Sequence, residues 1–336
     1  MSHATRRRMA TIAIAASCTA AACGTSENPE QPAAPPARIT AAYALPSDRA
    51  YPEGIAADPR TGDTYVGSYS TGAVYRAAPG SKQAEIFLPE GADGRKTANG
   101  LKVDQAGRLW VTDSTAGVAV YDTASRALIA RFDAPGPAAR FVNDLAITPD
   151  GTAYLTDSVR GVVYRITADE VARTAAHGGR ADMTTQFDLS PVLAPRAPDG
   201  FSLNGIVVDA GGRYLLVVDM VTGELFRIAL APDSADPIRK VALHGGTLIH
   251  GDGLELHDNT LWVVQNTDNA IARWTVTDDG ATATLDRRIT DAALSIPTTL
   301  VRTGNELLVV ASQFDKGGPM GPGTPQPFAV LAVDGV

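Results

Sequence analysis

A repeat with a period in the forties constrains this chain more than any other feature of its sequence. Five segments align on sight and a degenerate sixth follows, with starts 46, 44, 61, 48 and 46 residues apart. Each copy holds three β-rich strands separated by Gly, Asp or Asn turns, and a fourth strand follows. A period of this length with four strands per copy is typical of a β-propeller. The copies begin at Glu53, Asn99, Asn143, Asn204, Asp252 and Thr298.

Helical solenoids can have a similar period, but the pattern inside each copy excludes them. Val, Tyr and Thr alternate through Gly-rich turns, whereas helices require apolar residues at a 3.6-residue spacing. The last copy offers only three strands, and the missing outer strand is available at residues 39–45. Pairing the two ends of the chain in this way removes an exposed sheet edge. The sequence therefore predicts an all-β, six-bladed propeller of four-stranded blades over residues 39–336, closed by its N-terminal strand.

Strand direction predicts which residues share a face of the propeller. We call the face at which each blade's first strand begins the top face. Because successive strands alternate in direction, the residues that begin the six copies are expected to surround the mouth of the central tunnel there. Residues 315–327, between the second and third strands of the last blade, should border this mouth. Most of the longest interval's extra chain, residues 167–183, should lie on the bottom face; residues 191–199 are a smaller addition.

The predicted ring at the top mouth is rich in oxygen ligands. Glu53, Asn143, Asn204 and Asp252 provide two carboxylates and two amide carbonyls with a summed charge of −2. Such oxygens suit Ca²⁺, whose roughly six to eight ligands would leave places for water and substrate. Zinc or copper would favour His or Cys, neither of which begins a copy. The pattern predicts a site for one Ca²⁺, with another divalent cation as the alternative.

A structural explanation competes with this metal site. Asn-Gly and Asp-Gly are common turn dipeptides, so each such residue taken alone is expected to lie in a turn. Turn chemistry accounts poorly for Glu53, which is not a turn former, and for the second acid at Asp252. The four residues taken together therefore favour the metal site. Asn99 belongs to the same ring and is expected to face the substrate or nothing.

Further polar residues lie around this ring. Asp113, Asp157 and Asp219 end second strands, where support of the ring and capping of their own turns are equally compatible with the sequence. Asp144 follows one ring asparagine, and His250 lies two residues before the last ring acid. We assign supporting roles to Asp144, Asp219 and His250.

The pattern resembles the gluconolactonase/regucalcin (senescence marker protein) family, which is related to diisopropylfluorophosphatase and paraoxonase. The resemblance runs from about residue 50 to the end of the chain. It rests on EG at Glu53, RFVND at 140–144, LNGIVVD at 203–209 and GDGLEL at 251–256. It implies a six-bladed propeller with one divalent cation, usually Ca²⁺, at the top of the tunnel. The implied ligands are Glu53, Asn143, Asn204 and Asp252.

The resemblance also implies a reaction, the hydrolysis of lactones or related esters. Asp252 would be the catalytic carboxylate, either orienting or deprotonating water or attacking the substrate itself. Arg140 would bind substrate, although it precedes the asparagine by three residues where the family has two. Propellers are also common binding platforms, so a non-catalytic ligand- or protein-binding lipoprotein is the alternative, and a metal-bound but inactive relative is a third reading.

The N-terminus predicts export. Three arginines precede an uncharged, Ala-rich run from Met9 to Ala22, which has the charge order and length of a signal peptide and is too short to span a bilayer. The sequence before Cys23 resembles a bacterial lipobox, so we expect residues 1–22 to be removed and Cys23 to be lipidated. Cys18 is a second candidate. Twin-arginine export and an ordinary secretory signal are the alternatives.

The remaining composition fits an exported, tethered domain. Residues 23–38 are polar and Pro-rich, as suits a tether. Both cysteines lie before this tether or at its start, so the propeller is expected to lack disulfides. A net charge of −8 disfavours nucleic acid and anionic lipid as partners. We expect a monomeric lipoprotein on the outer face of the cell membrane or the periplasmic side, acting on a small lactone or ester.

Overall fold

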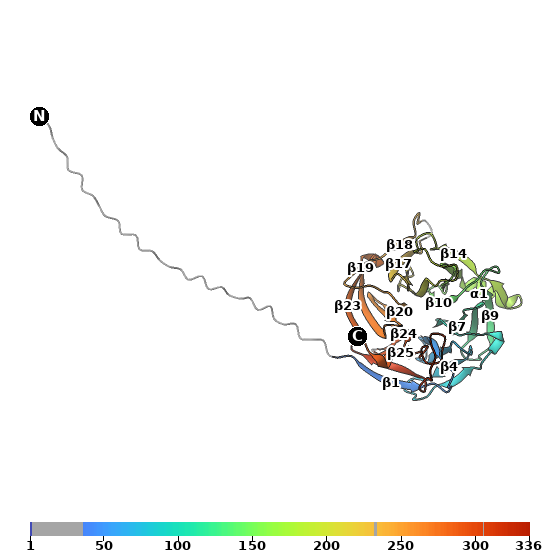
Figure 1. Cartoon of the computed structure of the whole chain (residues 1–336). Helices are drawn as coiled ribbons and strands as arrows, with labels where there is room; N and C mark the ends of the chain where they lie inside the picture. Colours follow the sequence, from blue (N-terminus) through green and yellow to red (C-terminus); the bar gives the residue numbers. More distant parts are fainter. Residues whose placement is uncertain (2–35, 232–233, 305) are drawn as a thin grey trace. The chain divides into compact units, whose positions relative to one another are not determined.

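The computed structural model describes residues 36–231, 234–304 and 306–336, together with Met1. Six sheets surround a common axis as a six-bladed β-propeller that spans Pro36–Val336 (Figure 1). This confirms the predicted fold class and number of blades. The predicted signal peptide, Cys23 and nearly all of the tether lie outside the described residues. No helix in the described part of the chain is both long and apolar enough to cross a membrane.

Each blade runs from an innermost to an outermost strand. Blade one contains β2 (Pro52–Ala57), β3 (Thr64–Ser68), β4 (Val74–Ala77) and β5 (Glu85–Leu88). Blade two contains β6 (Leu101–Val103), β7 (Arg108–Asp113), β8 (Gly117–Asp122) and β9 (Leu128–Asp133). Blade three contains β10 (Val142–Ile147), β11 (Ala153–Asp157), β12 (Val162–Ile166) and β14 (Thr184–Asp188).

The remaining blades follow the same order. Blade four contains β15 (Leu203–Val208), β16 (Tyr214–Asp219), β17 (Glu224–Ala229) and β18 (Ile238–Lys240). Blade five contains β20 (Gly251–His257), β21 (Thr260–Gln265), β22 (Ala270–Thr277) and β23 (Thr282–Thr290). Blade six contains β24 (Pro297–Thr303), β25 (Glu306–Ala311), β26 (Ala329–Asp334) and, outermost, β1 (Arg38–Ala44).

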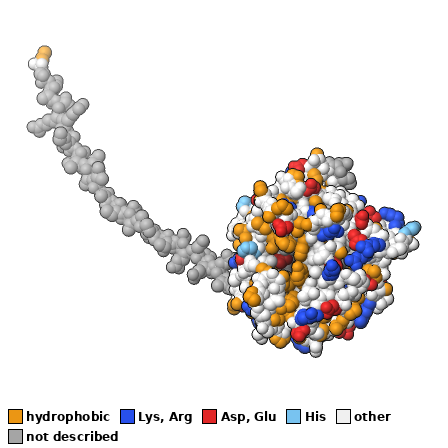
Figure 2. All heavy atoms as spheres, turned by 45° about the vertical axis from the view of Figure 1, so that its right-hand side comes forward, with side chains coloured by type: hydrophobic (Ala, Val, Ile, Leu, Met, Phe, Trp, Pro, Cys, Tyr) orange, Lys and Arg blue, Asp and Glu red, His pale blue; other side chains and the backbone are white. Residues whose placement is uncertain are grey.

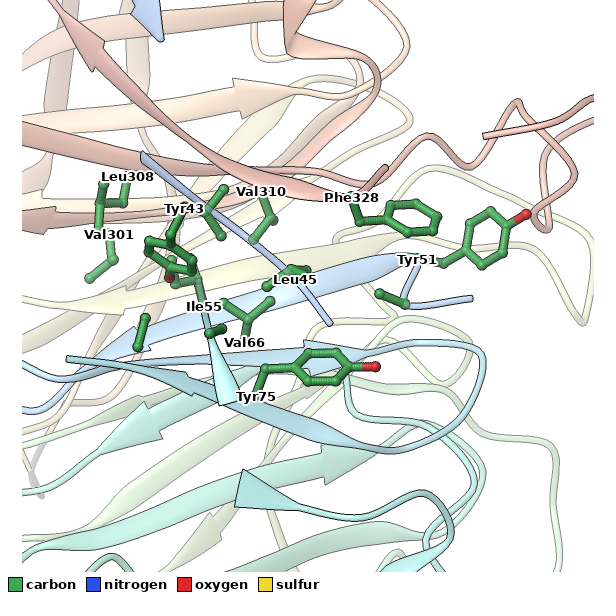
Figure 3. Packing of buried hydrophobic residues seen from close by; sticks show 14 of the residues in the cluster. Tyr43, Leu45, Tyr51, Ile55, Val66, Tyr75, Val301, Leu308, Val310 and Phe328 are labelled. Carbon is green, nitrogen blue, oxygen red and sulfur yellow. The ribbon is translucent and has the colours of Figure 1, made fainter. Parts of the chain in front are cut away.

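The two ends of the propeller pair as the sequence predicts. Strand β1 runs antiparallel to β26, and the guanidinium of Arg38 lies 2.6 Å from the carboxylate of Asp334. Behind this pairing, a buried apolar cluster joins blade six to blade one. Figure 3 shows side chains from β1, β2, β3 and β25 packed in this cluster. Pairing of β1 with β26 therefore buries apolar side chains as well as forming hydrogen bonds. It also gives blade six its fourth strand.

Two blades differ from the predicted four strands. Strand β13 (Arg180–Asp182) adds parallel to β9 at the edge of blade two, and β19 (Ala242–His244) adds parallel to β23 at the edge of blade five. Residues 238–244 are thus divided between β18 in blade four and β19 in blade five. A short extra strand pairs backbone groups that an edge strand otherwise leaves open.

The insertion at residues 167–183 forms a helix as well as β13. Helix α1 (Ala168–Ala176) begins at a capping box, in which Thr167 and Glu170 satisfy each other's backbone N–H groups. Its Val171 is buried in the apolar cluster between blades two and three. Ala168 lines a cavity with bottom-face residues such as Pro149, so this insertion lies on the bottom face, as predicted.

Candidate functional site

The residues that begin the blades lie in β-bulges. In blade one, Pro52 pairs with Ser68 and Ile55 with Val66, so β2 carries one extra residue at Glu53-Gly54. The same register shift occurs at the start of β10, β15, β20 and β24. A bulge bends its strand and changes the direction of a side chain. The fold repeats this device in five blades around one mouth, so the four predicted ligands lie in equivalent positions.

The glycines after these residues are required by close packing between blades. A β-carbon on Gly54 would overlap the carbonyl oxygen of Asn99, and one on Gly205 would overlap that of Asp252. Neither glycine has a positive φ, which a type I′ hairpin turn would demand. Asn204-Gly205 lies within β15 and does not form a type I′ turn. Glycine is present because the backbone of the next blade passes where a side chain would begin.

Threonine hydroxyls from neighbouring blades hydrogen-bond to the backbone of the ring residues. Each donates to the carbonyl oxygen of a ring residue, and Thr298 joins blade six back to blade one. The pairs are Thr112 Oγ1 with Asn143 O at 2.6 Å, Thr156 Oγ1 with Asn204 O at 2.7 Å, and Thr298 Oγ1 with Glu53 O at 2.7 Å. Rigid backbone positions are what a pre-organised site requires.

Neighbouring groups also orient the side chains of the ring. The amide nitrogen of Asn143 donates to Ser158 Oγ at 3.0 Å, so its carbonyl oxygen points elsewhere. The amide nitrogen of Asn204 lies 3.5 Å from the sulfur of Met220. Asn266 donates to one carboxylate oxygen of Asp252 at 2.8 Å. The second-strand ends therefore act on the ring directly in blades three to five.

Several buried oxygen atoms of the ring have no hydrogen-bond partner. These are Glu53 Oε2 and Asn143 Oδ1, and in Asn99 both the side-chain oxygen and nitrogen are unpaired. An unpaired buried polar atom costs on the order of 1–3 kcal/mol, so these atoms, which lie at one mouth, fit a site that binds a polar ligand or a cation. Asn99 is fully buried at the ring, and its side chain contacts no hydrogen-bonding group of the protein. The prediction that it faces either the substrate or nothing stays open.

Three buried carboxylates oppose one another near this mouth. Burial raises the pKa of Glu53 well above its usual value, and the charges of Asp252 and Asp144 raise it further. Burial likewise raises the pKa of Asp252 to about 7, against the hydrogen bond from Asn266. Burial also raises the pKa of Asp144, against the charge of Lys102 and two backbone N–H groups. A bound cation would remove this repulsion.

The donor set fits a hard divalent cation. It offers two carboxylates, two amide carbonyls and unpaired oxygens, which match the ligand preference of Ca²⁺. Over residues 36–231, 234–304 and 306–336, no group of three or more His, Cys, Asp and Glu side chains could hold a metal ion by itself. The candidate site depends on its amide oxygens, which are poor ligands for zinc or copper.

Other predicted residues lie further from the ring. The guanidinium of Arg140 donates to the carbonyl oxygens of Ala134 at 3.0 Å and Gly136 at 2.7 Å, so it holds the loop before β10. His250 has a positive φ, and its ring nitrogen lies 2.8 Å from the carboxylate of Asp268 on the surface. The substrate-binding role of Arg140 and the supporting role of His250 stay predictions.

The aspartates that end second strands cap their own turns. Asp219 accepts from the backbone N–H of Val221 at 2.9 Å. Asp113 and Asp157 accept in the same way from residues two positions further on. They also accept from backbone N–H groups in the segments that lead to Asn99 and Asn143, so capping and support occur together in these two copies. Asp144 differs, because its carboxylate lies in the tunnel and accepts from backbone N–H groups of its own and the next blade.

Sequence reasoning missed the charges deeper in the tunnel. The ammonium nitrogen of Lys102 lies 4.0 Å from a carboxylate oxygen of Glu255, and both line the space below the ring. Each lies three residues after a ring residue, Asn99 or Asp252. An alignment of the copies at the position three residues after each ring residue would have identified Lys102 and Glu255 as tunnel residues. The direct contact of Asn266 with Asp252 was also missed.

The bottom mouth differs in chemistry. It opens into a cavity of about 520 Å³, and two of the acids that line it form ion pairs with arginines of their own turns. Asp104 binds Arg108 at 2.6 Å, and Asp209 binds Arg213 at 2.9 Å. These arginine partners distinguish the two acids from Glu53 at the top mouth, which has an unpaired carboxylate oxygen.

Residues 315–327 border the top mouth, as predicted. The hydroxyl of Tyr51, two residues before Glu53, donates to the carbonyl of Lys316 at 3.1 Å. The ring of Tyr69 lies 5.3 Å from that of Phe314, which precedes this loop. The loop therefore covers the blade-one side of the mouth.

Comparisons with known proteins bear on the fold. No protein-family model matches the sequence, and no curated protein sequence matches it. Among solved structures, a gluconolactonase from Xanthomonas campestris is 17% identical with a TM-score of 0.59, over 89% of each chain. The Malassezia sympodialis allergen Mala s 1 is 15% identical with a TM-score of 0.60, over 88% of this chain and 96% of that one.

Two further structures give the same result. A luciferin-regenerating enzyme is 14% identical with a TM-score of 0.59, over 90% of this chain and 96% of that one. A virginiamycin B lyase from Staphylococcus aureus is 13% identical with a TM-score of 0.55, over 90% of this chain and all of that one. At such low identity, these likenesses establish a shared fold.

Proposed function

We propose that this chain is a Ca²⁺-dependent hydrolase of lactones or related esters. The observation that carries the proposal is the ring at the top mouth, where buried oxygens of Glu53 and Asn143 lack partners. Burial raises the pKa of both Glu53 and Asp252, and the charge of Asp144 raises both further. The fold shared with a gluconolactonase supports the proposal, although the identity is low.

The residues divide the work of such a reaction. Glu53, Asn143, Asn204 and Asp252 would hold the cation, which when bound supplies a Lewis acid for the substrate carbonyl. Asp252, oriented by Asn266, would hold or take a proton of the attacking water. The water oxygen bonds to the carbonyl carbon, the bond to the ring oxygen breaks, and the proton ends on that leaving oxygen. Asn99 would contact the substrate.

Calcium is expected to stabilise the protein by roughly 2–3 kcal/mol at a concentration 100 times its dissociation constant. The melting temperature should then rise by roughly 5 °C. The rise should be larger at pH 8 than at pH 5, because protons compete for carboxylates whose pKa is raised, to about 7 for Asp252. Calorimetry with calcium and with a chelator, at both pH values, measures the effect.

A matched pair of variants makes this test specific. Asn143→Leu should abolish the calcium-dependent rise, because it removes a ligand oxygen. Asp286→Asn, in the outer strand of blade five, should leave the rise intact. Equal melting temperatures with calcium and with chelator would contradict the metal site. If the protein binds calcium but hydrolyses no lactone or ester, the alternative function of a ligand-binding propeller is favoured instead.

We also propose that the protein is exported and tethered by lipid at Cys23. Cys23→Ser is expected to remove lipid attachment and leave unprocessed precursor or released protein, because the lipid is carried on the thiol. Metabolic labelling with a fatty-acid probe measures attachment, with Cys18→Ser as the control that should keep its label. Label that persists in Cys23→Ser and disappears in Cys18→Ser would assign the anchor to Cys18.

A further inference from the structure

Exposed apolar side chains gather on one side of the top mouth. Phe201 is 42% exposed and precedes β15, Val221 is 59% exposed and follows β16, and Ile249 is 38% exposed and precedes β20. All three belong to blades four and five. In Figure 2, a band of hydrophobic side chains runs along the propeller with acidic side chains set among them. We call Phe201, Val221 and Ile249 the apolar rim.

The apolar rim continues into the ring through direct contacts. Phe201 packs edge-on against Phe141, with ring centroids 4.8 Å apart, and Phe141 lies two residues before Asn143. Met220, next to Val221, touches the amide of Asn204 through its sulfur at 3.5 Å. Candidate ligands and apolar surface are therefore contiguous in blades three to five.

The rim lies away from the loop at residues 315–327. The loop at residues 315–327 lies against Tyr51 in blade one, on the other side. A ligand centred on the ring would therefore extend over blades four and five. Apolar surface around a small polar centre is typical of a site for a ligand with one polar group and an apolar body.

We propose that the substrate carries an uncharged aliphatic chain beside its lactone or ester group, and that the apolar rim binds this chain. The inference rests on the proposed function, because the polar group is assigned to the ring. A sugar lactone, with hydroxyl groups around its ring, would leave the exposed Phe, Val and Ile side chains without a role.

A series of ligands that cannot be hydrolysed tests the binding of the alkyl chain separately from catalysis. The probes are γ-lactams with alkyl substituents from methyl to heptyl, titrated by calorimetry in the presence of calcium. Affinity should rise by about two- to fourfold for each methylene that the rim buries. The triple variant Phe201→Ser, Val221→Ser, Ile249→Ser should lose at least about tenfold for the heptyl probe and little for the methyl probe.

Two exposed apolar residues elsewhere provide the control. Ile86 in β5 is 54% exposed and Leu128 in β9 is 40% exposed, and both lie in outermost antiparallel strands of blades one and two. Ile86→Ser with Leu128→Ser should leave the whole affinity series unchanged. Phe201→Ser also removes the packing against Phe141, and the methyl probe measures that effect separately, because its affinity does not depend on a long alkyl substituent.

The outcomes separate this inference from the proposed function. The inference is supported if affinity rises with the length of the alkyl substituent and the rim variant abolishes that rise. This holds even if no lactone is hydrolysed. Hydrolysis of lactones with no dependence on chain length would overturn the inference while the proposed function stands. A third outcome would also overturn the inference: the wild-type protein, but not the rim variant, binds phosphatidylcholine vesicles, and the affinity for the lactams does not depend on the length of the alkyl substituent. The rim would then be a membrane contact.

Discussion

Asp252→Asn is expected to lower the turnover of a lactone by at least about 100-fold at saturating calcium. The substitution keeps the size of the side chain and an oxygen that can accept from Asn266, which now donates at 2.8 Å. Amide oxygens are already proposed as ligands at Asn143 and Asn204, so calcium should still bind, with lower affinity. What is lost is the carboxylate that would hold a proton of water. Steady-state kinetics, with calcium occupancy measured by calorimetry, checks the expectation.

Two companion variants locate the effect. Asp286→Asn changes a carboxylate in the outer strand of blade five and should leave turnover within about twofold of wild type. Asn99→Ala, at the ring but outside the proposed ligand set, should change KM more than kcat. Wild-type turnover by Asp252→Asn with calcium bound would remove Asp252 from the reaction.

Gly205→Ala is expected to destabilise the propeller by roughly 1–3 kcal/mol or more and to weaken calcium binding. The new methyl group would overlap the carbonyl oxygen of Asp252, which belongs to the innermost strand of the next blade. Neither backbone can move freely, because β15 and β20 are each paired within their own sheet. Chemical denaturation and calcium titration of the variant measure both effects.

The matched control is Gly211→Ala, in the turn before β16. A β-carbon there would lie 3.2 Å from the side chain of Arg213, which is exposed and can move away. Its stability should differ from wild type by less than about 0.5 kcal/mol. If Gly205→Ala were equally stable and bound calcium equally well, packing between blades would not be the reason for the glycine.

The positions of the ring residues could be predicted because the repeat carries them. Equivalent positions in repeated blades around an axis must form a ring, whatever the details of packing. Glu53 and Asp252 depart from the asparagine that begins the second, third and fourth copies, and that departure indicated a charged centre. Residues 39–45 were identified as the closing strand because the last copy lacked one.

The surroundings of the ring could not be predicted in the same way. Whether Asn204-Gly205 forms a turn or a bulge depends on the backbone of blade five, 47 residues further on. Arg140 was expected to bind substrate, and only the fold shows its guanidinium held by the loop at residues 134–136. The Met220–Asn204 contact depends on the bulge that turns the asparagine.

The sequence by itself determined the period, the number of blades, the closing strand and the members of the ring, because these follow from local strand patterns repeated along the chain. The tertiary structure decided the bulges, the fifth strands of blades two and five, the repulsion among Glu53, Asp252 and Asp144, and the apolar rim. Each of these depends on atoms from different blades, whose separation is set by how the sheets twist and pack.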